Sequence, residues 1–260
     1  MRRHDLDHVG AGQEMGRLTG KAALVTGGSR GIGAAIARRL AADGASVLLT
    51  WQASADRAAE VVAGITAAGG TAEALQADSG DAAAVTGAVE ATAARFGRLD
   101  ILVNNAGMGV AGVIGEARLA DYDRCFDVNV RAVFVAMQAA ARLMLAGGRI
   151  ITIGSVNADR IPFAGGAAYA ATKAAVAGLT RGAARDLGPR GITVNLVQPG
   201  PIDTDMNPAD GPWAGAARAL LATGAYGQGT DVAALVAFLC GEEAGYITGA
   251  TLNVDGGYTA

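Results

Sequence analysis

From residue 21 onward the chain alternates short apolar runs with longer segments in which Ala and Leu recur at helical spacing. Short runs rich in Val, Ile, Leu and Thr are typical of strands, and amphipathic segments of ten or more residues are typical of helices. We predict strands at 22–27, 46–51, 71–77, 100–105, 149–155, 192–198 and 251–254. We predict helices at about 31–43, 54–68, 81–96, 118–146, 167–188 and 229–241.

This regular alternation of strand and helix predicts a parallel sheet that is covered by helices on both faces. The nearly unbroken apolar character of 22–25 and 101–103 fits strands that are buried on both sides. A length of 260 residues suits one large α/β domain. The expected fold is therefore α/β, a single-domain Rossmann-type doubly wound parallel sheet of about seven strands, formed by residues 15–260.

Two segments depart from this alternation. At 199–228 the sequence PGPIDTDMNPADGPW interrupts the pattern with Pro, Gly and Asp, and we expect this excursion to act as a substrate lid. Residues 1–14 are polar and lack the apolar centre of a signal peptide, so we expect a flexible N-terminal extension. His4 and His8 lie four residues apart within it, but no third ligand accompanies them and no metal site is predicted.

Charge and composition narrow the function classes. The net charge of −3 and the pI near 5.4, without any basic run, argue against a nucleic-acid partner. Charged residues and glycines interrupt every apolar stretch before it is long enough to span a membrane. The two cysteines, Cys125 and Cys240, are far apart in apolar helical segments, which favours a reduced, cytoplasmic protein over a disulfide framework.

A glycine-rich turn follows the first predicted strand. Gly27, Gly31 and Gly33 have the spacing G-x-x-x-G-x-G, between a strand and a helix. Such a turn lets the backbone approach a pyrophosphate closely, and the free N–H groups of the helix N-terminus attract anions. The sequence predicts a phosphate-binding loop, with a turn needed only for packing as the alternative.

Tyr169 and Lys173 form a second candidate for chemistry. Lys21 and Lys173 are the only lysines, whereas Arg is used everywhere else. Residues four apart share one face of a helix, so the Tyr169 and Lys173 side chains should lie side by side. An ammonium stabilises a phenolate and thereby makes a tyrosine a usable general acid and base. The alternative is a pair of surface side chains without a catalytic role.

Together these motifs resemble those of the short-chain dehydrogenase/reductase family. The resemblance rests on T-G-x-x-x-G-x-G at 26–33, N-N-A-G at 104–107, Ser155 with Tyr169-x-x-x-Lys173, and P-G at 199–200, and it extends over about 18–258. Within the family the chain resembles 3-oxoacyl-ACP reductases and, more closely but over narrower stretches, a subgroup of cyclic-di-GMP-binding biofilm-dispersal proteins. The narrower likeness lies in IGSVNADRIPFAGGAAYAATK and GPRGITVNLVQPGPIDTDMNPADGP.

The resemblance implies a catalytic set of Asn129, Ser155, Tyr169 and Lys173. By this likeness Tyr169 donates the proton, Lys173 holds the nicotinamide ribose, Ser155 binds the substrate carbonyl oxygen, and Asn129 holds a relay water. The interval from Ser155 to Tyr169 is fourteen residues, one more than is usual in the family, and the extra residue falls in NADRIPFAGG. For Ser155 a cap at the end of a strand is the alternative, and for Asn129 a satisfied buried amide.

The end of the second predicted strand indicates which nicotinamide cofactor is bound. Thr50, Trp51 and Gln52 stand where an enzyme specific for NAD usually has a carboxylate, while Arg30 and Ser54 suit a 2′-phosphate. We therefore expect NADP(H) to be preferred over NAD(H). Asp78 resembles a residue that contacts adenine, or is a helix N-cap. The predicted cofactor-binding residues are Gly27, Ser29, Arg30, Gly31, Ile32, Gly33, Ser54, Asp78, Asn105, Ala106, Gly107, Tyr169, Lys173, Pro199, Gly200, Ile202 and Thr204.

The expected function is NADPH-dependent reduction of a carbonyl, of ketone or 3-oxoacyl type, to an alcohol. The alternatives are a cyclic-di-GMP-binding regulatory protein with vestigial or secondary reductase activity, and a purely structural role. A binder of a dianionic dinucleotide should show clustered Arg, and only Arg30 and Arg160 suggest themselves near the cleft. The long helices 118–146 and 167–188 and the stretch YITGATLNVDGGYT resemble the surfaces through which related proteins form homotetramers.

Overall fold

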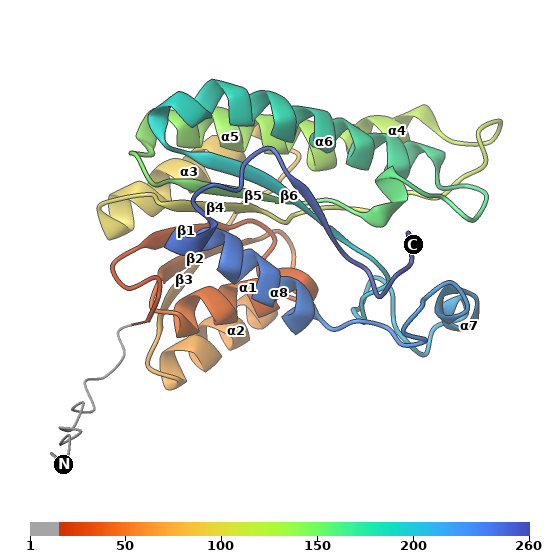
Figure 1. Ribbon diagram of the computed structural model, residues 1–260, viewed down its shortest axis with the longest axis horizontal. Coiled ribbons are helices and arrows are strands. Elements are labelled where there is room, and N and C mark those ends of the chain that lie inside the picture. The colour runs from red at the N-terminus through yellow and green to blue at the C-terminus, as the bar shows by residue number, and fades with distance from the viewer. Residues whose placement is uncertain (1–15) are drawn as a thin grey trace, which may run out of the picture.

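Seven parallel strands form one sheet in the order β3-β2-β1-β4-β5-β6-β7, with helices on both faces (Figure 1). The structure is a computed structural model that describes residues 16–260, so the predicted extension at 1–14, with His4 and His8, lies outside the described residues. The doubly wound parallel sheet predicted from the sequence is confirmed. None of the described helices combines the length and the apolar character needed to cross a bilayer.

The predicted strands all form, most of them one or two residues shorter than expected. The strands are β1 (Ala22–Val25), β2 (Ser46–Trp51), β3 (Thr71–Gln76), β4 (Ile101–Asn104), β5 (Arg149–Ile153), β6 (Thr193–Pro199) and β7 (Thr251–Val254). The α-helices are α1 (Gly31–Ala42), α2 (Ala55–Ala67), α3 (Ala82–Phe96), α4 (Leu119–Phe126), α5 (Ala132–Leu143), α6 (Ala167–Leu187), α7 (Ala214–Arg218) and α8 (Gly229–Cys240). Short 3-10 turns lie at η2 (Val156–Ala158), η3 (Gly188–Arg190) and η4 (Glu242–Ala244).

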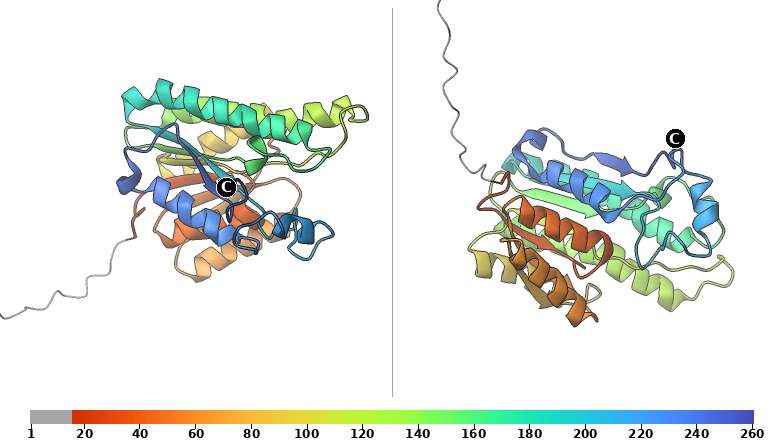
Figure 2. Two further views of the ribbon diagram at one scale, coloured as in Figure 1. Left: turned by 45° about the vertical axis from the view of Figure 1, so that its right-hand side comes forward. Right: turned by 90° about the horizontal axis from the view of Figure 1, so that it is seen from below.

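The sheet separates two apolar cores. Successive side chains of a strand point to opposite faces. Ala23 and Val25 of β1 accordingly pack into the core under α1, α2 and α8, whereas Leu24 packs into the core under α3, α5 and α6. Seen from below, α8 lies beside α1 (Figure 2). Burial on both faces explains why the strands are nearly continuous runs of apolar residues.

One predicted helix, 118–146, forms as an unbroken helix over 119–143 but is not α-helical throughout. It consists of α4, a π-helical segment η1 (Asp127–Arg131) and α5. A π turn holds one residue more than an α turn and is often found at functional sites. Here it contains Asn129, whose side chain is bound to groups outside the helix.

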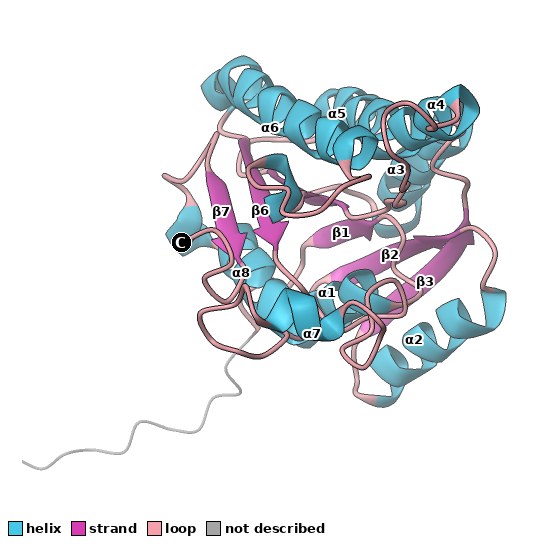
Figure 3. Cartoon of the chain, turned by 90° about the vertical axis from the view of Figure 1, so that its right-hand side faces the viewer, coloured by secondary structure: helices cyan, strands magenta, loops and turns pink. Residues whose placement is uncertain are grey.

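The order in which successive strands are added to the sheet reverses at β1, between β2 on one side and β4 on the other. Val25 of β1 pairs with Leu49 of β2 on one side and with Val103 of β4 on the other. In open α/β sheets, ligands bind at the carboxyl ends of the strands where the order reverses. The excursion that follows β6, including α7, lies at this end of the sheet, which faces the viewer in Figure 3.

Candidate active site

The glycine loop between β1 and α1 is shaped for close approach. Gly27 and Gly31 have left-handed backbone angles, with φ of 65° and 51°, that favour glycine. A Cβ on Gly33 would overlap the main-chain oxygen of Gly27 and the side-chain amide of Asn105. Helix α1 begins at Gly31, and the N-cap residue Arg30 makes no side-chain capping bond. The first N–H groups of α1 are therefore available to an anion.

Asn105 joins the ends of β1 and β4. Its Nδ2 donates to the main-chain oxygens of Thr26 and Gly27 at 2.9 and 3.0 Å. The hydroxyl oxygen of Thr26 accepts from the N–H groups of Asn105 and Ala106, both at 3.0 Å. These bonds give Asn105 a structural role, since they fix the glycine loop against the segment after β4.

Lys173 is buried next to the ring of Tyr169. Its Nζ lies 5.6 Å from the centroid of that ring and donates to the main-chain oxygen of Ile153 at 3.0 Å. The side chain is nearly buried, with 6% of the residue exposed. The two predicted side chains of α6 are thus together, and the alternative of a surface pair is wrong. One N–H of the ammonium is occupied by β5, and two remain for other partners.

Asn129 holds the loop after β4 against α6. Its Oδ1 accepts from the N–H of Met108, and its Nδ2 donates to the oxygen of Met108, both at 2.9 Å, and to Thr172 Oγ1 at 3.0 Å. Gly107 lies beside this amide: a Cβ on it would be 3.4 Å from Asn129 Oδ1 and 3.6 Å from Lys173 Nζ. Asn129 is a satisfied buried amide, the second of its two interpretations, and it positions the loop that borders Lys173.

Ser155 stands at the carboxyl end of β5. Its Oγ accepts from the N–H of Asn157 at 3.2 Å and so caps the turn η2. The cap that was the alternative role is present, and it leaves the hydroxyl hydrogen free to donate. The longer loop after η2 folds against the segment 109–115, where Gly112 donates its N–H to the oxygen of Gly165 at 3.0 Å.

Asp78 is not a helix cap. The N-cap of α3 is Asp81, whose Oδ1 accepts from the N–H of Ala83 at 2.8 Å. Asp78 instead accepts from the N–H of Gly80 at 2.7 Å and pairs with Arg124 at 2.8 Å. The Gly80 N–H, and then Arg124, hold the pKa of the Asp78 carboxyl below its ordinary value against the effect of burial. Of the two interpretations of Asp78, the helix N-cap is wrong, because Asp81 caps α3 and the Asp78 carboxylate is bound to Gly80 and Arg124 in the turn before the helix.

The excursion after β6 reaches back to the glycine loop. Gly200 donates its N–H to Val254 at 2.9 Å, and Ile202 is buried in a bridge with Gly227. The methyl group of Thr204 is 3.3 Å from the position that a Cβ on Gly31 would take. Pro199, Gly200, Ile202 and Thr204 therefore lead from the end of β6 to the start of α1.

Asp205, the next residue, pairs with two arginines. Its Oδ2 lies 3.7 Å from Nη1 of Arg30 and accepts a hydrogen bond from Nη1 of Arg57 in the first turn of α2. The Arg57 guanidinium, with a smaller effect from Arg30, holds the pKa of the Asp205 carboxyl below its ordinary value. Of the predicted pair Arg30 and Ser54, Arg30 is thus part of this cluster, and Ser54 is the N-cap of α2, three residues before Arg57.

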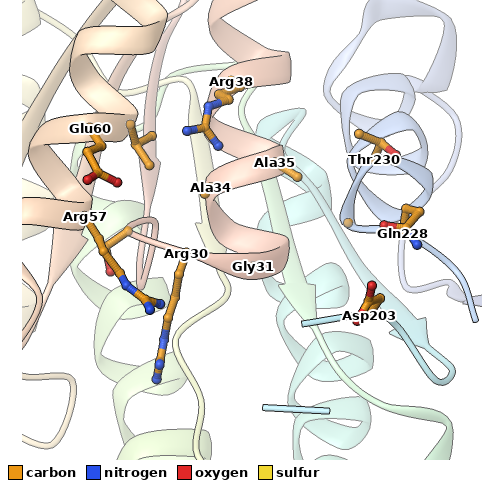
Figure 4. A pocket seen from close by; sticks show the side chains of 13 residues that line it. Arg30, Gly31, Ala34, Ala35, Arg38, Arg57, Glu60, Asp203, Gln228 and Thr230 are labelled. Carbon is orange, nitrogen blue, oxygen red and sulfur yellow. The ribbon is translucent and has the colours of Figure 1, made fainter. Parts of the chain in front are cut away.

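A pocket of about 520 Å³ opens beside this cluster, between α1, α2 and α8 (Figure 4). It is lined by Arg30, Arg38 and Arg57, together with Ser29 and Gly31 of the glycine loop. The prediction that only Arg30 and Arg160 lie near the cleft is therefore wrong, because three arginines line this pocket and Arg160 is not one of them. Arg160 instead donates to the main-chain oxygen of Tyr258 at 2.5 Å and lies over the ring of that tyrosine.

Sequence reasoning missed Arg38, Arg57 and Asp205. Arg57 lies three residues after Ser54, in the first turn of α2, and its closeness in sequence to Ser54 was a signal that it could lie near the phosphate site. Asp205 lies within the excursion, and nothing in the local sequence shows that it reaches the glycine loop.

Known proteins resemble this chain over almost its whole length. A family model described as enoyl-(acyl carrier protein) reductase matches residues 27–259. A cyclic-di-GMP-binding biofilm dispersal mediator protein of Escherichia coli (strain K12) is 52% identical over 246 residues, covering 95% of this chain and 100% of the relative. A 3-oxoacyl-[acyl-carrier-protein] reductase of Staphylococcus aureus (strain Mu50) is 42% identical, covering 91% of this chain and 97% of the relative.

Solved structures show the same fold with cofactor bound. A short chain dehydrogenase from Burkholderia cenocepacia J2315, in complex with NADP, is 60% identical with a TM-score of 0.92, covering 94% of this chain and 100% of its own. A blue fluorescent protein from a metagenomic library, in complex with NADPH, is 55% identical with a TM-score of 0.92 and the same coverage. The chain belongs to the short-chain dehydrogenase/reductase family, an oxidoreductase family. The cofactor expected from Arg30 and Ser54 is the one that these neighbours hold.

Proposed function

We propose that this chain is an NADP(H)-dependent oxidoreductase that reduces the carbonyl group of a ketone or 3-oxoacyl compound to an alcohol. The observation that carries the proposal is the buried Lys173 ammonium beside the Tyr169 ring, next to Gly107 and Asn129 at the carboxyl end of the sheet. Burying an ammonium is costly unless it is partnered, so a lysine without a role in the site is expected to keep its ammonium in solvent. The resemblance to reductases and the NADP complexes of the neighbours support the same function.

In this proposal the chain's own residues bind, orient and move a proton. NADPH, when bound, supplies the hydride that goes to the carbonyl carbon. The Tyr169 hydroxyl donates its proton to the carbonyl oxygen, which becomes the alcohol. The free hydroxyl hydrogen of Ser155 donates a hydrogen bond to the same oxygen and stabilises the negative charge that develops there. Lys173 offers its two remaining N–H groups to the cofactor ribose and to Tyr169.

The remaining predicted residues would hold the cofactor. Gly27, Gly31 and Gly33, with the first N–H groups of α1, suit the pyrophosphate, and Arg30 with Ser54 suits a 2′-phosphate. The segments 105–107 and 199–204 border the same end of the sheet as Lys173. Asp78, half-exposed beside Arg124, remains our proposed contact for adenine.

The test follows the consumption of NADPH and, separately, NADH by absorbance, with a panel of 3-oxoesters, diketones and cyclic ketones. We expect carbonyl-dependent oxidation of NADPH, faster than that of NADH, which falls at least about 10²-fold in Tyr169→Phe. Tyr246→Phe, a fully exposed tyrosine, is the matched control and should leave the rate unchanged. Retention of the rate in Tyr169→Phe contradicts the assignment of the proton donor, and a preference for NADH contradicts the cofactor.

A second candidate function is the binding of a cyclic dinucleotide. The pocket brings together Arg30, Arg38 and Arg57, cations of the kind that a dianionic ligand requires, although Glu60 and Asp203 also line it. The relative from Escherichia coli is named for binding cyclic-di-GMP. Titration with cyclic-di-GMP, alone and with NADPH as a competitor, separates the candidates. Saturable binding that Arg38→Gln weakens favours the regulatory role, whereas the absence of binding leaves the reductase.

We also propose that the chain forms a homotetramer. Aromatic side chains are exposed on α4, α5 and α8 and after η4, at Tyr122, Phe134, Phe238 and Tyr246. Exposed apolar groups on long helices are a usual basis for self-association. Light scattering should give the mass of four chains, and Phe134→Asp should lower that mass.

We propose the cytoplasm as the location of the protein, because Cys125 and Cys240 are free, buried thiols, as is usual in a reducing compartment.

A further inference from the structure

Asp205 brings together three elements that are far apart in sequence. Arg30 stands at the N-cap of α1, Arg57 in the first turn of α2, and Asp205 in the excursion after β6. About half of each side chain is exposed, with fractions of 55%, 50% and 50%. The cluster therefore lies at the surface, open to a ligand that approaches the glycine loop.

The charges of this cluster are unequal. Two guanidinium groups share one carboxylate oxygen, so the cluster itself carries one excess positive charge. The adjoining pocket of about 520 Å³ is also lined by Arg38 and by the carboxylates of Glu60 and Asp203. Figure 4 shows the Arg30 and Arg57 side chains reaching the same region in front of the N-terminus of α1. Two guanidinium groups that converge in this way are the usual protein partners of a phosphate.

The second strand makes the same place suitable for a phosphate on the ribose. β2 ends in Thr50 and Trp51, and Gln52 follows, so no carboxylate stands there to repel the phosphate. The N-cap of α2, Ser54, lies three residues before Arg57 and makes no side-chain capping bond. Arg57 thus extends from the helix that follows β2 to the arginine of the glycine loop.

We propose that Arg57 is a second residue that recognises the 2′-phosphate of NADP(H), together with Arg30, and that Asp205 competes with this phosphate for both arginines. The inference rests on the proposed NADP(H)-dependent function. Binding of a 2′-phosphate displaces the Asp205 carboxylate from the two guanidinium groups, and a ligand without that phosphate leaves the cluster as it is. Asp205 thereby lowers the affinity for NADP(H) and links the cofactor to the excursion.

The test measures dissociation constants by calorimetry for two ligand pairs that differ only in the 2′-phosphate. The pairs are NADPH with NADH, and adenosine 2′,5′-bisphosphate with 5′-AMP. Arg57→Gln should raise the dissociation constants of the two 2′-phosphate ligands about three- to tenfold and leave NADH and 5′-AMP unchanged. Asp205→Asn should lower the same two constants about two- to fivefold. Both effects should shrink as salt concentration rises, because the charges are exposed.

Arg39 and Asp43 provide the matched controls. They form a partly exposed ion pair at 3.0 Å at the other end of α1, so Arg39→Gln and Asp43→Asn make the same changes of charge away from the cluster. Neither control should alter any of the four constants by more than about twofold.

The outcomes separate this inference from the proposed function. If the wild type binds NADPH no better than NADH, the cofactor assignment and the inference both fail. If the wild type prefers NADPH and Arg30→Gln removes that preference, but Arg57→Gln changes NADPH and NADH alike, only the inference fails. An Asp205→Asn variant that does not bind the 2′-phosphate ligands more tightly overturns the competition.

Discussion

The ammonium of Lys173 lies 5.6 Å from the centre of the Tyr169 ring while it donates a hydrogen bond to Ile153 at the end of β5. Both side chains come from α6, and the acceptor comes from the sheet. The strand therefore fixes where the lysine nitrogen stands relative to the phenol. A single nitrogen placed between the strand and the ring suits a lysine, which explains the lysine at this position in a chain that otherwise uses arginine almost everywhere.

We expect Lys173→Arg to lose at least about 10²-fold in reductase rate, because a planar guanidinium does not place one nitrogen between the strand and the ring. The free energy of unfolding should fall by about 1–3 kcal/mol, since the extra donors are buried without acceptors. Stopped-assay rates and urea denaturation check these values. Lys21→Arg, at the chain's other lysine, is the control and should change neither; an active Lys173→Arg variant contradicts the need for an ammonium.

Gly33→Ala should destabilise the protein by about 1–3 kcal/mol, because its methyl group would overlap the Gly27 oxygen and the Asn105 amide. NADPH should bind about tenfold more weakly or worse, a loss of about 1.4 kcal/mol or more. A Cβ on Gly87 in α3 would meet no atom within 4 Å, and Gly87→Ala should instead stabilise by about 0.5–1 kcal/mol. Denaturation and NADPH titration of both variants give the comparison, and similar behaviour of the two would contradict the close packing of the loop.

Asn129→Ala should lower both stability and catalysis, since it leaves the N–H of Met108 without a partner and its oxygen with only the weak thiol donor of Cys125 at 3.8 Å. The unfolding free energy should fall by about 1–3 kcal/mol. Asn195→Ala removes another fully buried amide, which bonds Ile247 and Ala250, and should cost similar stability with little loss of rate. Reductase rates measured well below the unfolding temperature, together with the unfolding free energies of both variants, test this prediction. An equal loss of rate in the two variants would contradict a role for Asn129 in the site.

Asp78 should contribute to acid sensitivity. Its folded-state pKa is below the ordinary value of 3.8, so the charged form is favoured by folding. Its contribution is present above about pH 4 and is lost as the pH falls from there through the folded-state pKa. The size should stay below about 1 kcal/mol because the pair with Arg124 is partly exposed.

Asp78→Asn should therefore flatten the fall of the unfolding free energy below about pH 4, relative to the wild type. Asp123→Asn, which removes an exposed carboxylate beside Arg124 in sequence, serves as the control. Urea denaturation at a series of pH values gives both curves. Parallel curves for Asp78→Asn and the wild type would contradict the assignment.

The sequence predicted all seven strands because burial on both faces of a parallel sheet leaves unbroken apolar runs such as Ala22–Val25. It predicted the long helices as well, but not the short α7 within the excursion. It also predicted the approach of Lys173 to Tyr169, since spacing within one helix decides it. These are local patterns, and local patterns can be read from the chain.

Contacts between distant residues could not be predicted in this way. In the π-helical segment, Asn129 binds Met108 and Thr172, which lie 21 and 43 residues away from it along the chain. Arg57 and Asp205 are 148 residues apart, and each looks like an ordinary exposed charge in its own surroundings. Only the folded chain shows that the excursion carries an acid to the glycine loop.

The π-helical segment between α4 and α5 also sets the length of chain that this family member can tolerate there. A π turn holds one residue more than an α turn, so deleting one residue within Asp127–Arg131 would leave a regular α-helix and keep α4 in its orientation relative to α5. The outward side chains of α4, such as Tyr122, would then keep their direction. The Asn129 side chain, however, would lose the position from which it binds Met108 and Thr172, so the deletion should disturb the interior beside Lys173 and leave the surface of α4 as it is.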